Sequence, residues 1–170
     1  MSEEFIKRGK AFKFQDNIST DHIAPGRLFH LRNDLVEFSK HVLEDADPNF
    51  ASLVKKGDFI VAGNNFGLGS SREHAPQIIK IAGVGAVIAK SFARIFYRNA
   101  INIGLLAIEC DTDKIDANDE LELDIKKGIL KDLTKNIELQ ITPLPDVMIK
   151  LLNDGGLIEH LKKNVDFNLV

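Results

Sequence analysis

The sequence predicts an α/β domain in which a parallel βαβαβ unit is followed by a β-meander. Short apolar runs alternate with helix-like segments through the middle of the chain, and glycines stand at the breaks. In the last third, apolar residues instead recur at every second position. The 170 residues are 44% hydrophobic and 28% charged, which is enough apolar material for one buried core. We therefore expect one domain over residues 1–170.

The N-terminal third begins with a short strand and a polar loop. After a turn at Gly9, residues 11–14 place the charged Lys13 between two phenylalanines. This alternation of apolar and charged residues predicts a strand. Residues 16–26 are rich in cap and turn residues and end in Pro-Gly, which predicts a loop. A helix is expected from Asp34 to about Asp45, with Asn33 or Asp34 as its N-cap, because apolar residues recur there at three-to-four spacing.

Three strands and two helices are expected in the central unit. The strands are Phe59–Ala62, Ala86–Ala89 and residues 105–109, and the helices run from residue 71 or 72 to 82 and over residues 92–101. In parallel sheets of this kind, ligands bind at loops that follow the carboxyl ends of the strands. The loop after Phe59–Ala62 is therefore the first candidate site.

The last third is expected to form a β-meander and two closing helices. Its alternating apolar positions fall into three runs, which are Leu121, Leu123 and Ile125, then Ile129 and Leu130, then Ile137, Leu139 and Ile141. Helical spacing returns over residues 143–153 and Leu157–Lys163, on either side of two glycines. The tail from Asn164 is expected to fray.

Charge and hydropathy narrow the classes of partner. The formal net charge is −3, the pI is near 5.9, and no dense block of Lys or Arg occurs, so general nucleic-acid or membrane-surface binding is not expected. No apolar run is long enough to span a bilayer, and the first residues lack the pattern of a signal peptide. We expect a cytoplasmic protein.

The candidate loop over residues 63–76 has the sequence GNNFGLGSSREHAP. Its glycines allow the backbone to approach a ligand closely, Ser70 and Ser71 stand where the next helix is expected to begin, and Arg72 follows in the first turn. Helix N–H groups, hydroxyls and a guanidinium suit a carboxylate or phosphate on a small molecule. The loop lacks the lysine of a P-loop, the third small residue of a dinucleotide fingerprint and the flanking glycines of a hydrolase elbow, which disfavours those functions.

A purely structural interpretation of these polar residues stays open from spacing alone. One serine would cap the helix, Arg72 would pair with Glu73 or another acid, and His74 would pack. Asp21 and His22, in the first polar loop, are equally compatible with an ordinary turn and with a site.

Four stretches of the sequence carry a family resemblance, in order along nearly the whole chain. They are residues 9–14 (GKAFKF) with the following Asp16 and Asn17, residues 19–26 (STDHIAPG), the loop 63–76, and residues 90–104 (KSFARIFYRNAINIG). The run NFGLGSSREH is the most specific. The chain resembles the small, swivelling subunit of the aconitase superfamily of hydro-lyases, in particular the isopropylmalate dehydratase small-subunit group. The resemblance implies an aconitase swivel-type β/β/α domain.

The resemblance also implies roles for residues of the two polar loops. In that family the first serine of the Ser-Ser-Arg run is the catalytic base, which falls on Ser70, while Ser71 and Arg72 help to hold the substrate. The family's Thr-Asp-His turn implies that Asp21 faces the active site and helps to organise acid–base groups. His22 would orient its neighbours.

A third loop is implicated in substrate choice. Arg32 matches an arginine position in the loop that the family uses to recognise the variable part of its substrate. An arginine there can meet an extra carboxylate, as in aconitase-like and homoaconitase-like members, whereas Phe29 and Leu31 can supply the apolar contacts that an isopropyl group prefers.

The cofactor and the partner are also implied by the family. Its [4Fe–4S] cluster is held by three cysteines of a separate large subunit, and Cys110, the lone cysteine here, cannot supply such a ligand set. No metal ligands are expected on this chain. The implied assembly is a heterodimer or heterotetramer with the cluster-bearing large subunit, acting on a small hydroxy-di- or tricarboxylate.

The function expected from the resemblance is isomerisation of 2-isopropylmalate and 3-isopropylmalate by dehydration and rehydration, a step of leucine biosynthesis. A homoaconitase small subunit or a 2,3-dimethylmalate dehydratase small subunit would use the same chemistry. A module that binds a small acid without catalysis is the alternative from a different class.

Overall fold

The computed structural model describes residues 5–164. One seven-stranded sheet has the order β4-β3-β2-β1-β5-β6-β7. Strands β1 (Ile6–Lys13), β2 (Phe59–Ala62), β3 (Ala86–Ala89) and β4 (Ala107–Glu109) are parallel to one another, as expected of the central unit. Strands β5 (Glu120–Asp124), β6 (Ile129–Asp132) and β7 (Ile137–Gln140) form the antiparallel meander that the alternating pattern predicts.

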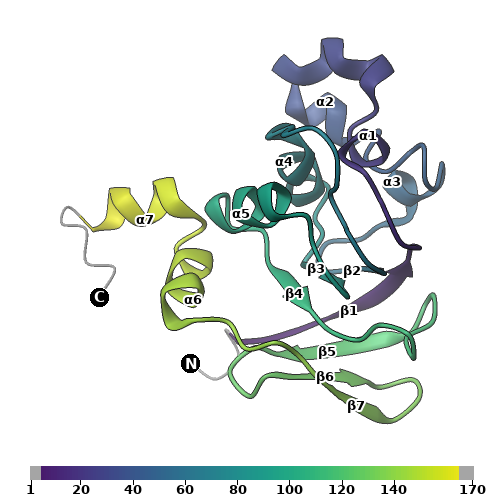
Figure 1. Ribbon diagram of the computed structural model, residues 1–170, viewed down its shortest axis with the longest axis vertical. Helices are drawn as coiled ribbons and strands as arrows, with labels where there is room; N and C mark the ends of the chain where they lie inside the picture. The colour runs from purple at the N-terminus through teal and green to yellow at the C-terminus, as the bar shows by residue number, and fades with distance from the viewer. Residues whose placement is uncertain (1–4, 165–170) are drawn as a thin grey trace.

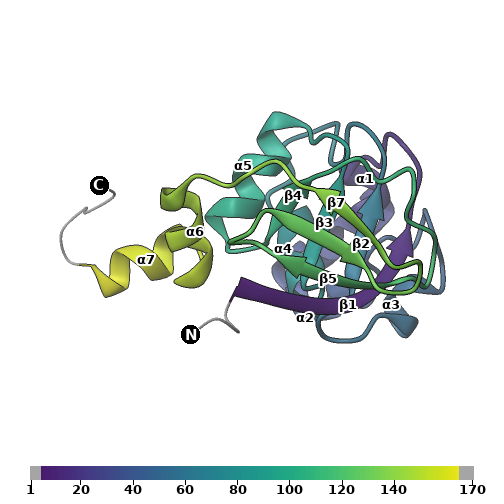
Figure 2. The same cartoon turned by 90° about the horizontal axis from the view of Figure 1, so that it is seen from below.

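The sheet curls so that its parallel strands are covered on both faces (Figures 1 and 2). Every residue of β2 and β3 is buried. Alternate residues face two cores because successive side chains of a strand point to opposite faces. Ile60 and Val87 lie in the core under the helices, whereas Val61 and Ile88 lie in the core that also contains Leu123 from the meander. The loop after β2 therefore emerges from the most buried part of the fold.

Five helices and one 3₁₀ helix connect or cover the parallel strands. They are α1 (Thr20–Ile23), η2 (Gly26–Asn33), α2 (Leu35–Ser39), α3 (Phe50–Leu53), α4 (His74–Ile81) and α5 (Arg94–Asn102). Helix α4 joins β2 to β3 and α5 joins β3 to β4, which gives the predicted βαβαβ order. Among residues 5–164, no helix is long and apolar enough to cross a bilayer.

Strand β1 is longer than predicted, and Gly9 lies inside it instead of in a turn before it. A side chain at Gly9 would overlap the carbonyl oxygen of Gly57, in the turn before β2. The glycine is therefore explained by a close approach of two backbones, which its position in the sequence cannot reveal. The same strand pairs with β2 on one side and β5 on the other, so it joins the parallel and antiparallel halves.

Helix α2 is shorter than predicted, because it ends at Ser39 instead of near Asp45. Leu43 has a left-handed backbone with φ of 57° and donates its N–H to the carbonyl of Ile23 in α1. The apolar spacing of this segment is real, since Leu43 is buried, but turns carry it instead of a helix. The N-cap is Asp34, whose side chain accepts the N–H of Glu37.

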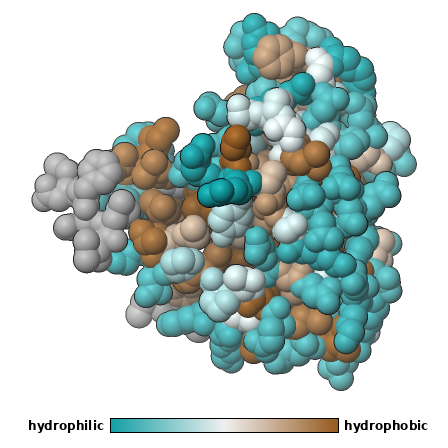
Figure 3. Space-filling model, in the orientation of Figure 1, coloured by the Kyte–Doolittle hydropathy of each residue, from teal (hydrophilic) through white to brown (hydrophobic). Residues whose placement is uncertain are grey.

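The closing helices α6 (Asp146–Asn153) and α7 (Leu157–Lys163) project to one side of the molecule (Figure 1). Helix α6 has no buried residue, and in Figure 3 apolar atoms gather over this pair of helices. Ile158 on α7 is 67% exposed. The pair therefore adds little to the cores that position the loop after β2. Part of the tail expected to fray, residues 165–170, lies outside the described residues.

A buried carboxyl pair in the meander gives a stability prediction. Asp132 in β6 is 1% exposed and accepts the N–H of Lys135, 3.1 Å away. Its second oxygen has no partner among the described residues. Burial, and then the neighbouring carboxyl of Asp119, raise the pKa of Asp132 above its usual value. The ionised form of Asp132 thus destabilises the folded chain.

We expect Asp132→Asn to raise the free energy of unfolding by about 1 kcal/mol at pH 7. Because the folded pKa of Asp132 is raised, the stability from its protonated form is complete below the unfolded pKa and is lost as pH rises through the folded pKa. The increase in the free energy of unfolding caused by Asp132→Asn should therefore be smaller in thermal melts at lower pH. The control is Asp124→Asn, which alters a similar turn contact to Lys127. An equal increase in the free energy of unfolding in both variants would show that the buried charge of Asp132 is not the cause.

Candidate active site

The loop between β2 and α4 is held in place by the first polar segment. Gly67 donates its N–H to the carbonyl of Ile18 at 2.7 Å, and the N–H of Thr20 donates to the carbonyl of Leu68 at 2.8 Å. The structure thereby brings together the two polar loops that the sequence singles out. They meet where the backbone leaves the carboxyl end of a parallel strand, as predicted for a ligand site.

Gly67 is required by the packing of the loop on α5. Its φ is +85°, and an added side chain would overlap the ring of Phe96, which is buried in the helix-side core. Glycine is the residue that adopts this backbone freely and lets the ring approach. Packing against the helix-side core therefore determines the backbone conformation of the loop at Gly67.

The serines do not begin α4, which corrects the prediction for this segment. Helix α4 starts at His74, and no side chain caps it. The carbonyl of Ser70 accepts the N–H of Arg72 at 2.8 Å, and Gly69 has a φ of +109°, so the chain makes a turn before the helix. The residues from Ser70 to Arg72 therefore belong to the loop and not to a helix N-terminus.

An open hollow of about 610 Å³ lies at the end of this loop. Its lining residues are Phe29, Ser70, Ser71, Arg72, Glu73 and His74. Both serines are exposed, and neither hydroxyl has a hydrogen-bond partner among the described residues. The structure thus presents two free hydroxyls and a guanidinium to the same space.

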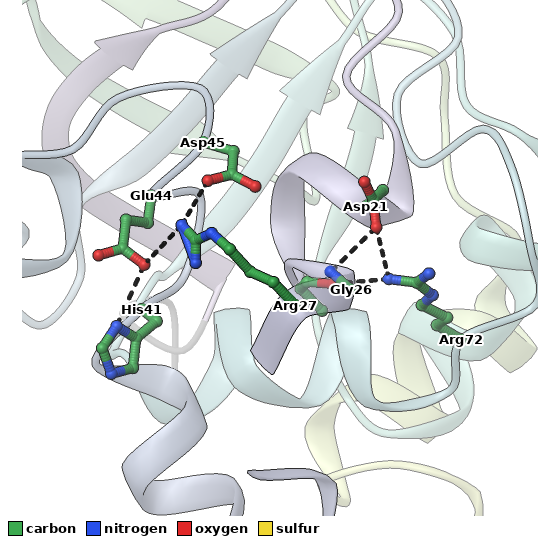
Figure 4. Close-up of polar contacts among 8 residues, drawn as sticks. Asp21, Gly26, Arg27, His41, Glu44, Asp45 and Arg72 are labelled. Carbon is green, nitrogen blue, oxygen red and sulfur yellow. Dashed lines mark hydrogen bonds and ion pairs between the residues drawn. The ribbon is translucent and has the colours of Figure 1, made fainter. Parts of the chain in front are cut away.

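Arg72 is anchored through one of its two terminal nitrogens (Figure 4). Its Nη1 donates to Asp21 Oδ1 at 2.9 Å and to the carbonyl of Ala24 at 2.8 Å. Asp21 Oδ1 also accepts the N–H of Gly26 at 3.0 Å. The Nε and Nη2 groups of Arg72 have no acceptor among the described residues, so the pairing with an acid leaves donors for an anion in the hollow.

His22 is fixed by a capping box at the start of α1. Its Nδ1 accepts the N–H of Ser19 at 2.9 Å, and its own N–H donates to the Ser19 hydroxyl at 3.1 Å. A ring nitrogen that accepts this bond carries no proton, so neutral His22 holds its proton on Nε2. The local role of His22 is to order the segment that carries Asp21.

The predicted recognition loop is a 3₁₀ helix, η2, instead of a loop. Arg32 Nη1 donates to the carbonyl of Phe29 at 3.2 Å, and its guanidinium carbon lies 4.6 Å from the centroid of the Phe29 ring. Phe29 is 44% exposed and lines the hollow, whereas Leu31 packs against the helix-side core. Of the three predicted residues, Phe29 alone lines the hollow.

Ion pairs tie the start of η2 to the turn that follows α2 (Figure 4). Arg27 Nη2 lies 2.6 Å from Asp45 Oδ1 and 3.3 Å from Glu44 Oε2. Glu44 also contacts His41. These exposed pairs link η2 to that turn but are individually weak.

His74 completes the wall of the hollow, and the sequence assigns it no role beyond packing. Its ring centroid lies 5.6 Å from that of Phe29 and 5.4 Å from that of Phe38. Burial, and then the positive charges of Arg72 and Arg32, lower the pKa of His74. His74 is therefore neutral near pH 7 and adds no charge that would compete with Arg72. In the sequence, only the position of His74 near Arg72 in the same motif indicates that it belongs to the site.

Cys110 is buried, and burial raises the pKa of its thiol to about 11. A thiol with such a pKa stays protonated near pH 7 and makes a poor metal ligand. Within residues 5–164, no group of three or more His, Cys, Asp or Glu side chains is placed to hold a metal ion.

Comparisons with known proteins agree with this geometry. Residues 41–113 match the family described as "Aconitase C-terminal domain". The chain is 60% identical to the "3-isopropylmalate dehydratase small subunit 2" of Archaeoglobus fulgidus, over 95% of this chain and 98% of the relative. The chain belongs to the 3-isopropylmalate dehydratase small-subunit family.

Two further similarities extend this result. A crystal structure of a 3-isopropylmalate dehydratase from Methanocaldococcus jannaschii matches with a TM-score of 0.89 and 46% identity, over 93% of this chain and 94% of that one. The expected aconitase swivel-type fold is thereby confirmed. The chain is also 52% identical to the "Methanogen homoaconitase small subunit" of Methanothermobacter thermautotrophicus, over 96% of this chain and 95% of the relative.

Proposed function

We propose that this chain is the small subunit of a hydro-lyase that isomerises 2-isopropylmalate and 3-isopropylmalate by dehydration and rehydration in leucine biosynthesis. The observation that carries the proposal is the open hollow, which is lined by an exposed serine and by an anchored arginine that keeps unused donors. The family to which the chain belongs supports the choice of reaction. We place the enzyme in the cytoplasm.

In the proposed mechanism, Ser70 removes a proton from the carbon next to a substrate carboxylate. A serine alkoxide is improbable in water, so the site must stabilise its negative charge. The positive charge of Arg72 and the N–H of Ser71, which has no acceptor among the described residues, are available for this. Ser71 and the free Nε and Nη2 of Arg72 bind a carboxylate, which fixes the carbon to be deprotonated near Ser70.

Asp21 holds Arg72 from the side away from its free donors, and His22 orders the turn that carries Asp21. Asp21 and His22 thus help to position the Arg72 guanidinium. When water adds back across the double bond, Ser70 gives its proton to the carbon that lost the hydroxyl, and the hydroxyl goes to the carbon that lost the proton. The reaction is then an isomerisation with no net loss of water.

The other half of the site lies on a partner in this proposal. A [4Fe–4S] cluster on the large subunit would supply an iron that assists departure of the substrate hydroxyl. This chain would close over that site with its hollow, in a heterodimer or heterotetramer. The high pKa of the buried Cys110 thiol supports a cluster held entirely by the partner.

The surroundings of Arg32 favour isopropylmalate over substrates with an additional carboxylate. Arg32 covers Phe29 and bonds to its carbonyl, so at this end the Phe29 ring lines the hollow and the Arg32 guanidinium does not. Phe29 offers the contact that an isopropyl group prefers, whereas an extra carboxylate needs a free cation. The runner-up is a homoaconitase subunit, supported by the methanogen relative, or a 2,3-dimethylmalate dehydratase subunit, which would use the same chemistry.

A complex with a cluster-bearing large subunit, with its cluster restored, tests the proposal. We expect the highest kcat/KM on 2-isopropylmalate among isopropylmalate, homoaconitate and 2,3-dimethylmalate. A higher kcat/KM on homoaconitate or 2,3-dimethylmalate would make that compound the substrate instead. Absence of turnover on all three, with complex formation intact, would instead support a module that binds a small acid without catalysis.

Arg32→Met provides a second test of substrate choice. Methionine keeps an apolar cover over Phe29 without charge. We expect kcat/KM for 2-isopropylmalate to stay within about threefold of the wild type, because an uncharged substrate end loses no ion pair. If Arg32 instead received a carboxylate, activity on homoaconitate would be high in the wild type and would fall by about tenfold or more in the variant.

A further inference from the structure

A buried hydroxyl lies directly beneath the proposed base. Thr20 is 4% exposed and is the first residue of α1. Its Oγ1 donates to the carbonyl oxygen of Ser70 at 3.1 Å. Its backbone N–H donates to the carbonyl of Leu68 at 2.8 Å. One residue thus holds the loop at two positions on either side of Gly69.

These contacts fix the peptide plane that follows Ser70. The same carbonyl oxygen accepts the N–H of Arg72 at 2.8 Å, so two donors from different directions determine where it points. No cis peptide occurs in the described chain, and in a trans peptide the N–H points opposite to the C=O. The N–H of Ser71 is therefore directed away from Thr20.

The loop has little other support at this point. Ser70 and Ser71 are exposed, their hydroxyls have no partner within residues 5–164, and the segment before α4 has no regular structure. Gly69 adopts a φ of +109°, and a side chain there would lie 3.2 Å from Thr20 Oγ1. A backbone that can turn this freely needs an anchor to keep a reactive side chain in one orientation.

We propose that Thr20 is a positioning residue for Ser70. Its hydroxyl holds the Ser70 carbonyl, and through the peptide plane it sets both the direction of the Ser70 side chain and that of the Ser71 N–H. The proposal rests on the role given to Ser70 in the proposed function. It assigns Thr20 no contact with substrate, because its side chain is buried below the loop.

The test replaces the hydroxyl by a methyl group of similar size. Thr20→Val in the reconstituted complex should lower kcat by about tenfold or more, while KM for 2-isopropylmalate stays within about twofold. Thr20→Ser, which restores a hydroxyl, should recover most of the lost kcat. The matched control is Thr112→Val. Thr112 is also buried, and its hydroxyl donates to a backbone carbonyl, that of Ala62, at 2.7 Å.

Amide hydrogen exchange on the full chain gives a readout that does not depend on activity. Thr20→Val should accelerate exchange at Arg72, whose N–H bonds to the Ser70 carbonyl, whereas Thr112→Val should not. If exchange is unchanged, or if the wild type turns over and both valine variants lose kcat equally, Thr20 is only a structural residue. If the wild type itself does not turn over, the proposed function fails while the exchange result still decides whether Thr20 anchors the loop.

Discussion

Replacing Ser70 with Ala is expected to lower kcat of the reconstituted complex by about a thousandfold, because the variant lacks the group that accepts the substrate proton. KM should change little, since Arg72 and Ser71 still bind the carboxylate. Ser70 is exposed and its hydroxyl has no partner among the described residues, so the free energy of unfolding should stay within about 0.5 kcal/mol of the wild type. Steady-state kinetics and thermal melts measure both effects.

Ser52→Ala is the control for this variant. Ser52 is also exposed and lies on α3, where its hydroxyl donates to the carbonyl of Asn49 at 2.9 Å. Its loss should leave kcat unchanged. If Ser70→Ala retains near-normal kcat in a complex of normal stability, the base lies elsewhere.

Replacing Arg72 with Lys should instead act mainly on substrate binding. Lysine keeps the positive charge, but its single ammonium cannot bond to Asp21 and Ala24 and also present a forked pair of donors to a carboxylate. We expect kcat/KM to fall by about 10-fold to 100-fold, with a rise in KM as the larger part.

Arg94→Lys is the matched control, because Arg94 is an exposed arginine at the start of α5. That change should leave kcat/KM within about twofold of the wild type. A purely structural Arg72 would give a different pattern, in which Arg72→Lys lowers the melting temperature and the yield of complex while the complex that forms keeps its KM.

The sequence predicts the sheet well because its strands have local signals. Phe59–Ala62 and Ala86–Ala89 are short apolar runs bounded by turn residues, and both are found with the predicted bounds. Strand β1 is predicted too short because Gly9 is placed by a contact with Gly57, 48 residues later in the chain. Local patterns are informative where one segment alone decides its structure, and they fail where a distant backbone does.

The same limit applies to the candidate site. Spacing suggests a helix starting at Ser71 or Arg72, but bonds from Thr20 and Arg72 to the Ser70 carbonyl keep the segment in a loop. The contact between Asp21 and Arg72 spans 51 residues and has no local signal. The family resemblance identifies Asp21 and Arg72 because a family motif retains residues that are distant in sequence but meet in the fold. His74 is recognised as part of the site only from the structure, where it lines the hollow.

The most direct test of the account is to follow formation of the carbon–carbon double bond when excess 2-isopropylmalate is mixed with the reconstituted complex. The ultraviolet absorbance of the unsaturated diacid reports proton removal and hydroxyl departure without the later rehydration. We expect the wild-type complex to form this product, and the Ser70→Ala complex to bind the substrate with similar affinity while forming about a thousandfold less per unit time. Formation at a near-normal rate by the Ser70→Ala complex would contradict the central claim that Ser70 is the base.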